Sequence, residues 1–204
     1  MENFYSYLEN LVTKLNISAK IENAKNNSQK DFLILNLENH IDLTKVLSEL
    51  KNDENLKFKI LTDLFGADFP KKEKRFEIVY NLLSMKLNKR MAVKIHLTEN
   101  ETPSTAEKVF KCANWYEREV FDMFGVRFAG HSDMRRILTD YGFVGHPLRK
   151  DFPVYGEVEV RYDEKLKRVV YEKVNLHQEF RVFDFESDWT DPKYVLPGDE
   201  KGFK

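Results

Sequence analysis

The sequence has a single cysteine, Cys112, among its 204 residues. One thiol cannot form an intrachain disulfide, and it is too few for a structural zinc site or an iron–sulfur cluster, which need several ligands. Nucleotide-binding strings of the G-x-G-x-x-G or P-loop type are also missing. We therefore expect that this chain binds no cofactor itself. Cys112 is expected in the middle of a helix as a small, inert core residue.

Long apolar runs and an excess of either charge are absent as well. The longest apolar stretches span only a few residues, whereas a helix needs roughly 20 to cross a bilayer. Residues 1–15 carry acids among apolar residues, unlike a secretory signal. We therefore expect a cytoplasmic chain that meets a membrane only through a partner. Lys plus Arg total 33 against 34 Asp plus Glu, so there is no electrostatic reason to expect nucleic acid.

The first half of the chain alternates helix and strand patterns. Apolar residues at helical spacing predict helices over 4–15 and 43–50, the second with Asp42 just ahead of it as N-cap. A β-prone run at 32–37 follows a polar bend, which predicts a hairpin. Alternating residues over 76–82 and 91–97 predict an antiparallel pair with one buried face. The fold class is therefore α+β, with an antiparallel or mixed sheet packed by helices.

A long helix is predicted from Ser104 to Phe124. Pro103 suits a first turn, Ser104 and Glu107 have the spacing of an S-x-x-E capping box, and Gly125 is a natural C-terminal stop.

The pattern changes after this helix. Residues 125–156 hold five of the eight glycines and two of the six prolines, which argues against regular structure. A hairpin is predicted near 157–174. We therefore divide the chain into a globular domain, 1–128, and an extended C-terminal arm, 129–204.

The composition of this arm favours a protein interface over disorder, because disordered tails are poor in aromatic residues. Its aromatic residues include Phe143, Phe152, Tyr155, Phe180, Phe183, Phe185, Trp189 and Tyr194. Only two arginines precede residue 101, and eight follow it, among them Arg181; arginine is enriched at interfaces. The alternative is an arginine-rich solvated loop.

Charged residues near the end of the long helix admit two interpretations. Glu119 and Asp122 share a helix face, as paired catalytic carboxylates can. The favoured interpretation is an ion-pair network that anchors the arm, in which Glu117 takes part and Arg118 pairs with Asp122 at i, i+4.

Two histidines could suggest a metal. His131, Asp133 and His146, with Glu119, would be the residues of a standalone metal-dependent hydrolase, but their spacing lacks the closeness of common zinc motifs. The favoured roles of both histidines are hydrogen bonds within a loop.

The string Leu148 to Pro153 combines two cations, an acid and an aromatic residue in an extended frame. Arg149 and Asp151 are expected to pair either across an interface or as an intramolecular clamp onto the chain's own helix. The sequence leaves these two alternatives open, because buried charges need partners without specifying whose.

The string WYEREVFDMFGV (Trp115 to Val126), followed by GHSDMRRILTDYGFVGHPLRKDFP (Gly130 to Pro153), resembles the signature stretch of the C subunit family of respiratory complex I. The resemblance continues to Trp189 and covers about half of the chain. Two positions depart from the family pattern: Ser132 replaces an expected proline, and Val144 an expected acidic or polar residue.

The resemblance implies a structural subunit, inactive alone, of the proton-translocating NADH:quinone oxidoreductase. It implies neighbours in the D and B subunits, a peripheral position on the cytoplasmic side of the cell inner membrane, and FMN and iron–sulfur clusters in partner subunits. It implies no catalytic, cofactor or metal residue in this chain. The alternative is the equivalent subunit of a related membrane-bound hydrogenase or formate-oxidising complex. The residues expected to be structural or interfacial are Glu117, Arg118, Glu119, Asp122, His131, Arg135, Arg136, Asp140, Tyr141, His146, Pro147, Arg149, Lys150, Asp151, Phe152 and Pro153.

Overall fold

The structure is a computed structural model that describes residues 2–23, 32–154, 156–175 and 178. The chain divides into two compact units, Met1–Pro153 and Val154–Lys204, which are described separately. The first unit thus extends beyond residue 128, where the sequence suggested a boundary. The expectations for some aromatic residues and one arginine lie outside the described residues: Tyr155, Phe180, Arg181, Phe183, Phe185, Trp189 and Tyr194.

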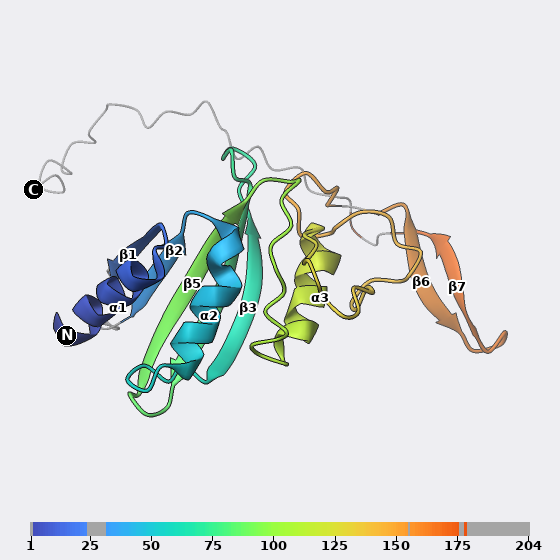
Figure 1. The fold of residues 1–204 in the computed structure, drawn as a ribbon. Helices are drawn as coiled ribbons and strands as arrows, with labels where there is room; N and C mark the ends of the chain where they lie inside the picture. The colour runs from blue at the N-terminus through green and yellow to red at the C-terminus, as the bar shows by residue number, and fades with distance from the viewer. Residues whose placement is uncertain (1, 24–31, 155, 176–177, 179–204) are drawn as a thin grey trace, which may run out of the picture. The chain divides into compact units, whose positions relative to one another are not determined.

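The first unit is a mixed sheet with three helices (Figure 1), which confirms the α+β prediction. Its elements are α1 (Glu2–Leu15), β1 (Ala19–Asn23), β2 (Leu33–Leu37), η1 (His40–Asp42), α2 (Leu43–Asn52), β3 (Ile60–Asp68), β4 (Phe76–Ser84), β5 (Lys89–Leu97) and α3 (Ala113–Phe124). The sheet order is β1-β2-β5-β4-β3, and only the β2–β5 pair is parallel.

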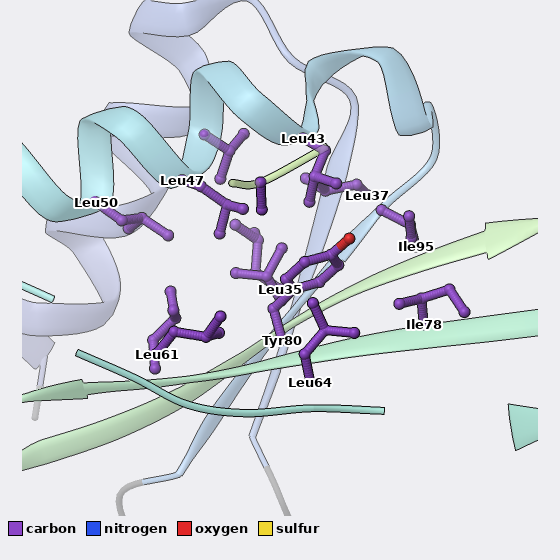
Figure 2. Packing of buried hydrophobic residues seen from close by; sticks show 14 of the residues in the cluster. Leu35, Leu37, Leu43, Leu47, Leu50, Leu61, Leu64, Ile78, Tyr80 and Ile95 are labelled. Carbon is purple, nitrogen blue, oxygen red and sulfur yellow. The ribbon is translucent and has the colours of Figure 1, made fainter. Parts of the chain in front are cut away.

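The core lies between the helices and one face of the sheet. Helix α2 buries Leu43, Leu47 and Leu50 completely, and Figure 2 shows these side chains directed at Leu35 and Tyr80 of the sheet. Burial of this apolar face, at about 25 cal/mol per Å², is what holds the helix on the sheet. Asp42 occupies the predicted N-cap position of α2, but its side chain makes no capping hydrogen bond.

Strand β3 is absent from the sequence prediction. Its pairing with β4 is irregular between Leu61 and Asp63, so the buried residues Leu61 and Leu64 are three apart rather than two or four. A local bulge of this kind breaks the alternation by which a strand is recognised.

Helix α3 begins at Ala113, so the predicted start at Ser104 is wrong. The preceding segment instead pairs with residue 129: the Thr105 N–H donates to the Ala129 carbonyl, and the Ala129 N–H donates to the Pro103 carbonyl. The expected end is confirmed, because Gly125 has φ 82° and its N–H donates to the Phe121 carbonyl.

Cys112 was expected within a helix core and is instead exposed at the N-cap position of α3. Since the helix starts later than predicted, Cys112 lies just before its first turn rather than on its buried face. In the described part of the chain no helix has the length and apolar character needed to cross a membrane.

The second unit contains the predicted hairpin, formed by β6 (Val158–Asp163) and β7 (Arg168–Lys173). Lys167 adopts φ 49° in the turn between the two strands. The structure therefore confirms a C-terminal hairpin within the expected range 157–174.

Close packing of α3 against β3 makes Gly66 a sensitive position. A Cβ at Gly66 would lie 2.9 Å from Cδ2 of Phe124, whereas one at Gly142 would meet nothing within 4 Å. We expect Gly66→Ala to lower the free energy of unfolding by about 1–3 kcal/mol, as overpacked core positions do. Gly142→Ala, the control, should change it by less than about 0.5 kcal/mol. Urea unfolding of both variants checks this, and equal effects would contradict the packing of α3 on β3.

Candidate functional site

The carboxylate of Asp122, on the last turn of α3, is the anchor of the loop that follows the helix. Its side chain has 0% exposure. Oδ2 accepts three consecutive backbone N–H groups, from Ile137 at 3.1 Å, Leu138 at 2.7 Å and Thr139 at 2.9 Å. Oδ1 accepts the Thr139 hydroxyl at 2.5 Å and Nη1 of Arg136 at 2.7 Å. One side chain thus satisfies a whole turn of loop backbone.

This environment decides the charge of Asp122. Burial alone would raise its pKa, but the hydrogen bonds from Thr139, Arg136 and Leu138 outweigh burial and hold the pKa well below its usual range. Asp122 is therefore an ionised, internally neutralised group rather than an acid or base available to a substrate.

Two arginines bind loop carbonyls. Arg118 donates from Nε to the carbonyl of Arg135 at 3.0 Å and from Nη2 to that of Arg136 at 3.1 Å. Arg136 donates from Nη2 to the carbonyl of Gly145 at 3.0 Å. The expected pair between Arg118 and Asp122 is thus replaced: Asp122 takes Arg136, and Arg118 is used for backbone carbonyls.

His146 contacts the C-terminal end of α3. Its Nδ1 lies 2.9 Å from the carbonyl oxygen of Asp122. Its ring packs edge-on against the ring of Phe121, with 5.9 Å between the ring centres. A Cβ at Gly125 would lie 2.7 Å from this ring, so glycine is required there for space as well as for its positive φ. The half-buried Pro147 follows.

Glu117 and His131 form a second buried contact of α3. The Glu117 carboxylate accepts the Thr105 hydroxyl at 2.5 Å and the Ala106 N–H at 2.7 Å. His131 Nε2 lies 3.9 Å from Oε2 of Glu117 and 3.1 Å from the carbonyl of Asn114. Glu117 thus ties the segment before α3 to the helix.

The C-terminal end of the loop is bound by residues at the end of β3 and just before β4. Arg75 donates from Nε and Nη2 to the fully buried carboxylate of Asp68 at 2.6 and 2.8 Å. The hydrogen bonds from Arg75 lower the pKa of the Asp68 carboxyl group. The same Asp68 accepts the Lys150 N–H at 2.7 Å, and Arg75 also contacts Asp151 at 3.0 Å.

Arg149 completes this sheet-edge cluster. Its Nη2 donates to Glu99 at 2.8 Å, and its guanidinium lies 5.0 Å from the ring centre of Phe76. Arg149 and Asp151 therefore contact the sheet of their own chain, not its helix as the clamp alternative had it. Asp151 nevertheless remains 59% exposed, so its surface is open to a further contact.

The middle of the loop packs on itself. Phe152 lies 5.8 Å from Phe143 between ring centres, and a Cβ at Gly145 would lie 2.7 Å from the Phe152 ring. Pro153, the next residue, is exposed.

Several side chains of the loop project outward from this rigid frame. Leu138 is 63% exposed, Tyr141 82% and Val144 89%. Asp140 is exposed, and Arg135 lies at the surface with a forked pair to Asp133 at 2.7 to 2.9 Å. We call Leu138, Tyr141 and Val144 the outer loop patch. An ordered backbone that displays apolar side chains is suited to binding another protein.

The residues of the hydrolase alternative do not form a site. His131 contacts Asn114 and accepts the Asp133 N–H, whereas His146 contacts Asp122. Glu119 is exposed. Over the part of the chain that the structure describes, no group of three His, Cys, Asp or Glu residues could hold a metal ion.

Three residues that hold the loop were not predicted from the sequence: Asp68, Arg75 and Glu99. Asp68 ends the strand that went unrecognised, so nothing marked it as buried. The acid-base spacing of Asp68 and Arg75 across a short turn was the available signal.

Comparisons with known proteins agree on one family. A family model described as the respiratory-chain NADH dehydrogenase, 30 Kd subunit, matches residues 39–158. The C subunit of the NADH-quinone oxidoreductase of Rickettsia typhi is 54% identical over 97% of this chain and 99% of its own length. The protein of the same name from Brucella ovis is 58% identical over 78% of this chain and 79% of its own length.

A solved structure shares the fold. A chain of the membrane-bound sulfane sulfur reductase, an archaeal respiratory membrane complex, superposes with a TM-score of 0.61 over 82% of this chain and 99% of that chain. Its sequence identity is 24%, so this likeness concerns the fold alone.

Removing the anchoring charge should weaken the first unit. We expect Asp122→Asn to lower the free energy of unfolding by about 3–5 kcal/mol, because it leaves the largely buried Arg136 without its counterion. Asp133→Asn, which disrupts only the exposed pair with Arg135, is the matched control and should leave the urea midpoint unchanged. The anchoring role is wrong if the two variants unfold at the same urea concentration.

The lowered pKa values of the same carboxylates predict that the free energy of unfolding falls in acid. The pKa values of Asp122 and Asp68 are lowered in the folded chain. Their contribution is therefore present above the unfolded value of about 3.9 and is lost as the pH falls through the folded values. We expect the free energy of unfolding to decline below about pH 4, with a shallower decline in Asp122→Asn. Chemical unfolding at a series of pH values measures this, and parallel curves would contradict it.

Proposed function

The chain belongs to the family of the respiratory-chain NADH dehydrogenase 30 kDa subunit, and on that premise we propose that it is a structural, non-redox subunit of an NADH-quinone oxidoreductase. In this role it has no activity alone. It contributes to an enzyme that passes electrons from NADH to quinone through FMN and iron–sulfur centres held by other subunits.

The outer loop patch is the observation that supports a role in assembly. Leu138, Tyr141 and Val144 are exposed by 63% or more, although the loop beneath them is fixed by the bonds to Asp122, Arg118 and His146. A loop that is already ordered loses little conformational entropy on binding, so more of the contact energy appears as affinity. The loop therefore serves to dock the chain onto neighbouring subunits.

The hairpin supports the same role within the second unit. The register places Val158, Val160 and Tyr162 on one face of β6, and these side chains are 53–58% exposed. On the other face Arg161 pairs with Glu172 at 2.6 Å. A two-stranded hairpin is marginally stable in water, so its apolar face gains from the cover of a partner.

The partners are the D and B subunits of the same complex, and the complex brings the chain to the cytoplasmic side of the cell inner membrane. A single cysteine among 204 residues leaves the iron–sulfur ligands to those partners. Arg149 and Asp151 keep their proposed interfacial role beyond their own sheet. The names of the relatives favour this enzyme over the hydrogenase alternative.

Affinity purification of the tagged chain from its native membranes tests this function. We expect the other subunits of the complex in the eluate, identified by mass spectrometry, together with NADH:quinone activity. A hydrogenase-type set of subunits would select the related complex, and a chain recovered alone would overturn the proposal.

A charge in the outer loop patch should block assembly without unfolding the chain. We expect Tyr141→Asp to reduce the recovery of assembled complex about tenfold or more, because the new carboxylate would be desolvated at the interface. The stability of the isolated chain should change by less than about 0.5 kcal/mol, since Tyr141 is 82% exposed.

Met85→Asp is the matched control. Met85 is likewise an exposed apolar residue, with 71% exposure, but it lies in the turn between β4 and β5. It should leave both the recovery of the complex and the stability of the chain unchanged. Equal recovery with Tyr141→Asp and wild type would show that the outer loop patch is not the docking surface.

A further inference from the structure

Glu117 is a buried carboxyl group that the docking role does not use. Its side chain has 0% exposure. It accepts hydrogen bonds from the Thr105 hydroxyl and the Ala106 N–H. Both donors are neutral. Among the described residues, only the ring of His131 comes within ion-pair range, with Nε2 at 3.9 Å from Oε2.

His131 cannot supply a positive charge in this arrangement. Its Nδ1 accepts the backbone N–H of Asp133 at 3.0 Å, which requires that Nδ1 carry no proton. The ring proton then lies on Nε2, where the Asn114 carbonyl accepts it at 3.1 Å. The imidazole is therefore the neutral tautomer, and Glu117 has no cationic partner among the described residues.

The other titratable groups around Glu117 also fail to provide one. Tyr80 of β4 is fully buried, its hydroxyl has no hydrogen-bond partner in the described structure, and the pKa of this phenol is raised by burial and by the charge of Glu117. Glu107, from the segment before α3, adds a like charge. Arg118, the next residue on α3, is engaged by the carbonyls of the loop.

We propose that Glu117 is a proton-binding site that holds the segment 103–107 on α3 in its neutral form and loosens that segment when it ionises. A carboxylate without a cation is costly in a dry interior, whereas a neutral carboxyl group keeps the bond from the Ala106 N–H and donates its own proton to the Thr105 oxygen. The segment leads to the loop, because the Thr105 N–H donates to Ala129 and the Ala129 N–H donates to Pro103. Glu107 also accepts the N–H and hydroxyl of Ser132. The proton on Glu117 therefore regulates how firmly the start of the loop is attached.

The direction in which the pKa of Glu117 is shifted agrees with the proposal. Burial raises the pKa of Glu117 to about 7, against the lowering effect of the hydrogen bonds from Thr105 and Ala106. Because the folded value lies above the unfolded value of about 4.3, the stabilising contribution is fully present below the unfolded value. It is lost as the pH rises from there through the folded value.

Direct titration of the carboxyl group is the first test. The Cδ carbon of Glu117 is followed by carbon-13 NMR in the full-length chain between pH 4 and pH 9 and is assigned by its absence in Glu117→Gln. We expect a midpoint near neutrality, together with a loss of exchange protection at the Ala106 amide above the midpoint, relative to Glu117→Gln at the same pH. A midpoint in the ordinary range for glutamate, about 4.3, would overturn the proposal.

The second test separates titration from a purely structural role. Glutamine keeps the shape of the neutral carboxyl group and cannot ionise. We expect wild type to lose stability relative to Glu117→Gln between pH 5 and pH 8, by on the order of 100-fold in the unfolding equilibrium constant. Glu119→Gln, two residues along α3 at an exposed position, should follow wild type at every pH. If Glu117→Gln is weakened equally at both pH values, the carboxyl group is a fixed structural acceptor and the proposal is wrong.

Discussion

The hydrogen bonds of the buried Asp122 carboxylate are the interaction on which the loop after α3 depends. The loop after α3 has no helix or strand of its own over residues 125–153, yet its backbone amides still need hydrogen-bond partners. Asp122 provides acceptors for three of these amides in a row, and Arg118 provides donors for two carbonyls. A helix thus supplies from its side chains what secondary structure would otherwise supply from the backbone.

This arrangement shows how a loop without regular secondary structure is held in one conformation, as the proposed docking role requires. Its two ends are fixed at different places, by Asp122 and His146 at α3 and by Asp68 and Arg75 at the sheet edge. Each fixed charge is neutralised inside the chain, so a partner does not have to compensate it. The exposed side chains of the loop include the outer loop patch, which is available for apolar contact. Stability and binding are therefore assigned to different residues of one segment.

Much of the fold followed from periodicity, and the failures have local causes. The buried stripe of α2 and the alternation of β4 and β5 were predicted because each buries one face against the same core. The prediction of a wet second face was wrong for the first part of β4, where Glu77 and Val79 are buried as well. Strand β3 was missed because a bulge interrupts its alternation, and the start of α3 was placed too early because the S-x-x-E pattern at Ser104 also fits a turn. There Thr105 and Glu107 bind α3 and Ser132 instead of capping a helix.

The sequence allowed us to predict most of the residues that form the candidate site, but not which of them pair with one another. Sequence showed that charged residues cluster near the end of α3 and that residues 125–156 lack regular structure, and it favoured an anchoring network over catalysis. It could not show that Asp122 would take Arg136 rather than Arg118, because that choice depends on the path of the loop in space. The same holds for Arg149, whose partner Glu99 is 50 residues away.

Amide hydrogen exchange at Ile137, Leu138 and Thr139 in the isolated full-length chain tests the central claim most directly. If Asp122 holds the loop before any partner binds, these three amides exchange far more slowly than in an unfolded chain and at rates similar to one another. Exchange at the rate of an unfolded peptide would contradict the account, because the loop would then acquire its order only from the partner.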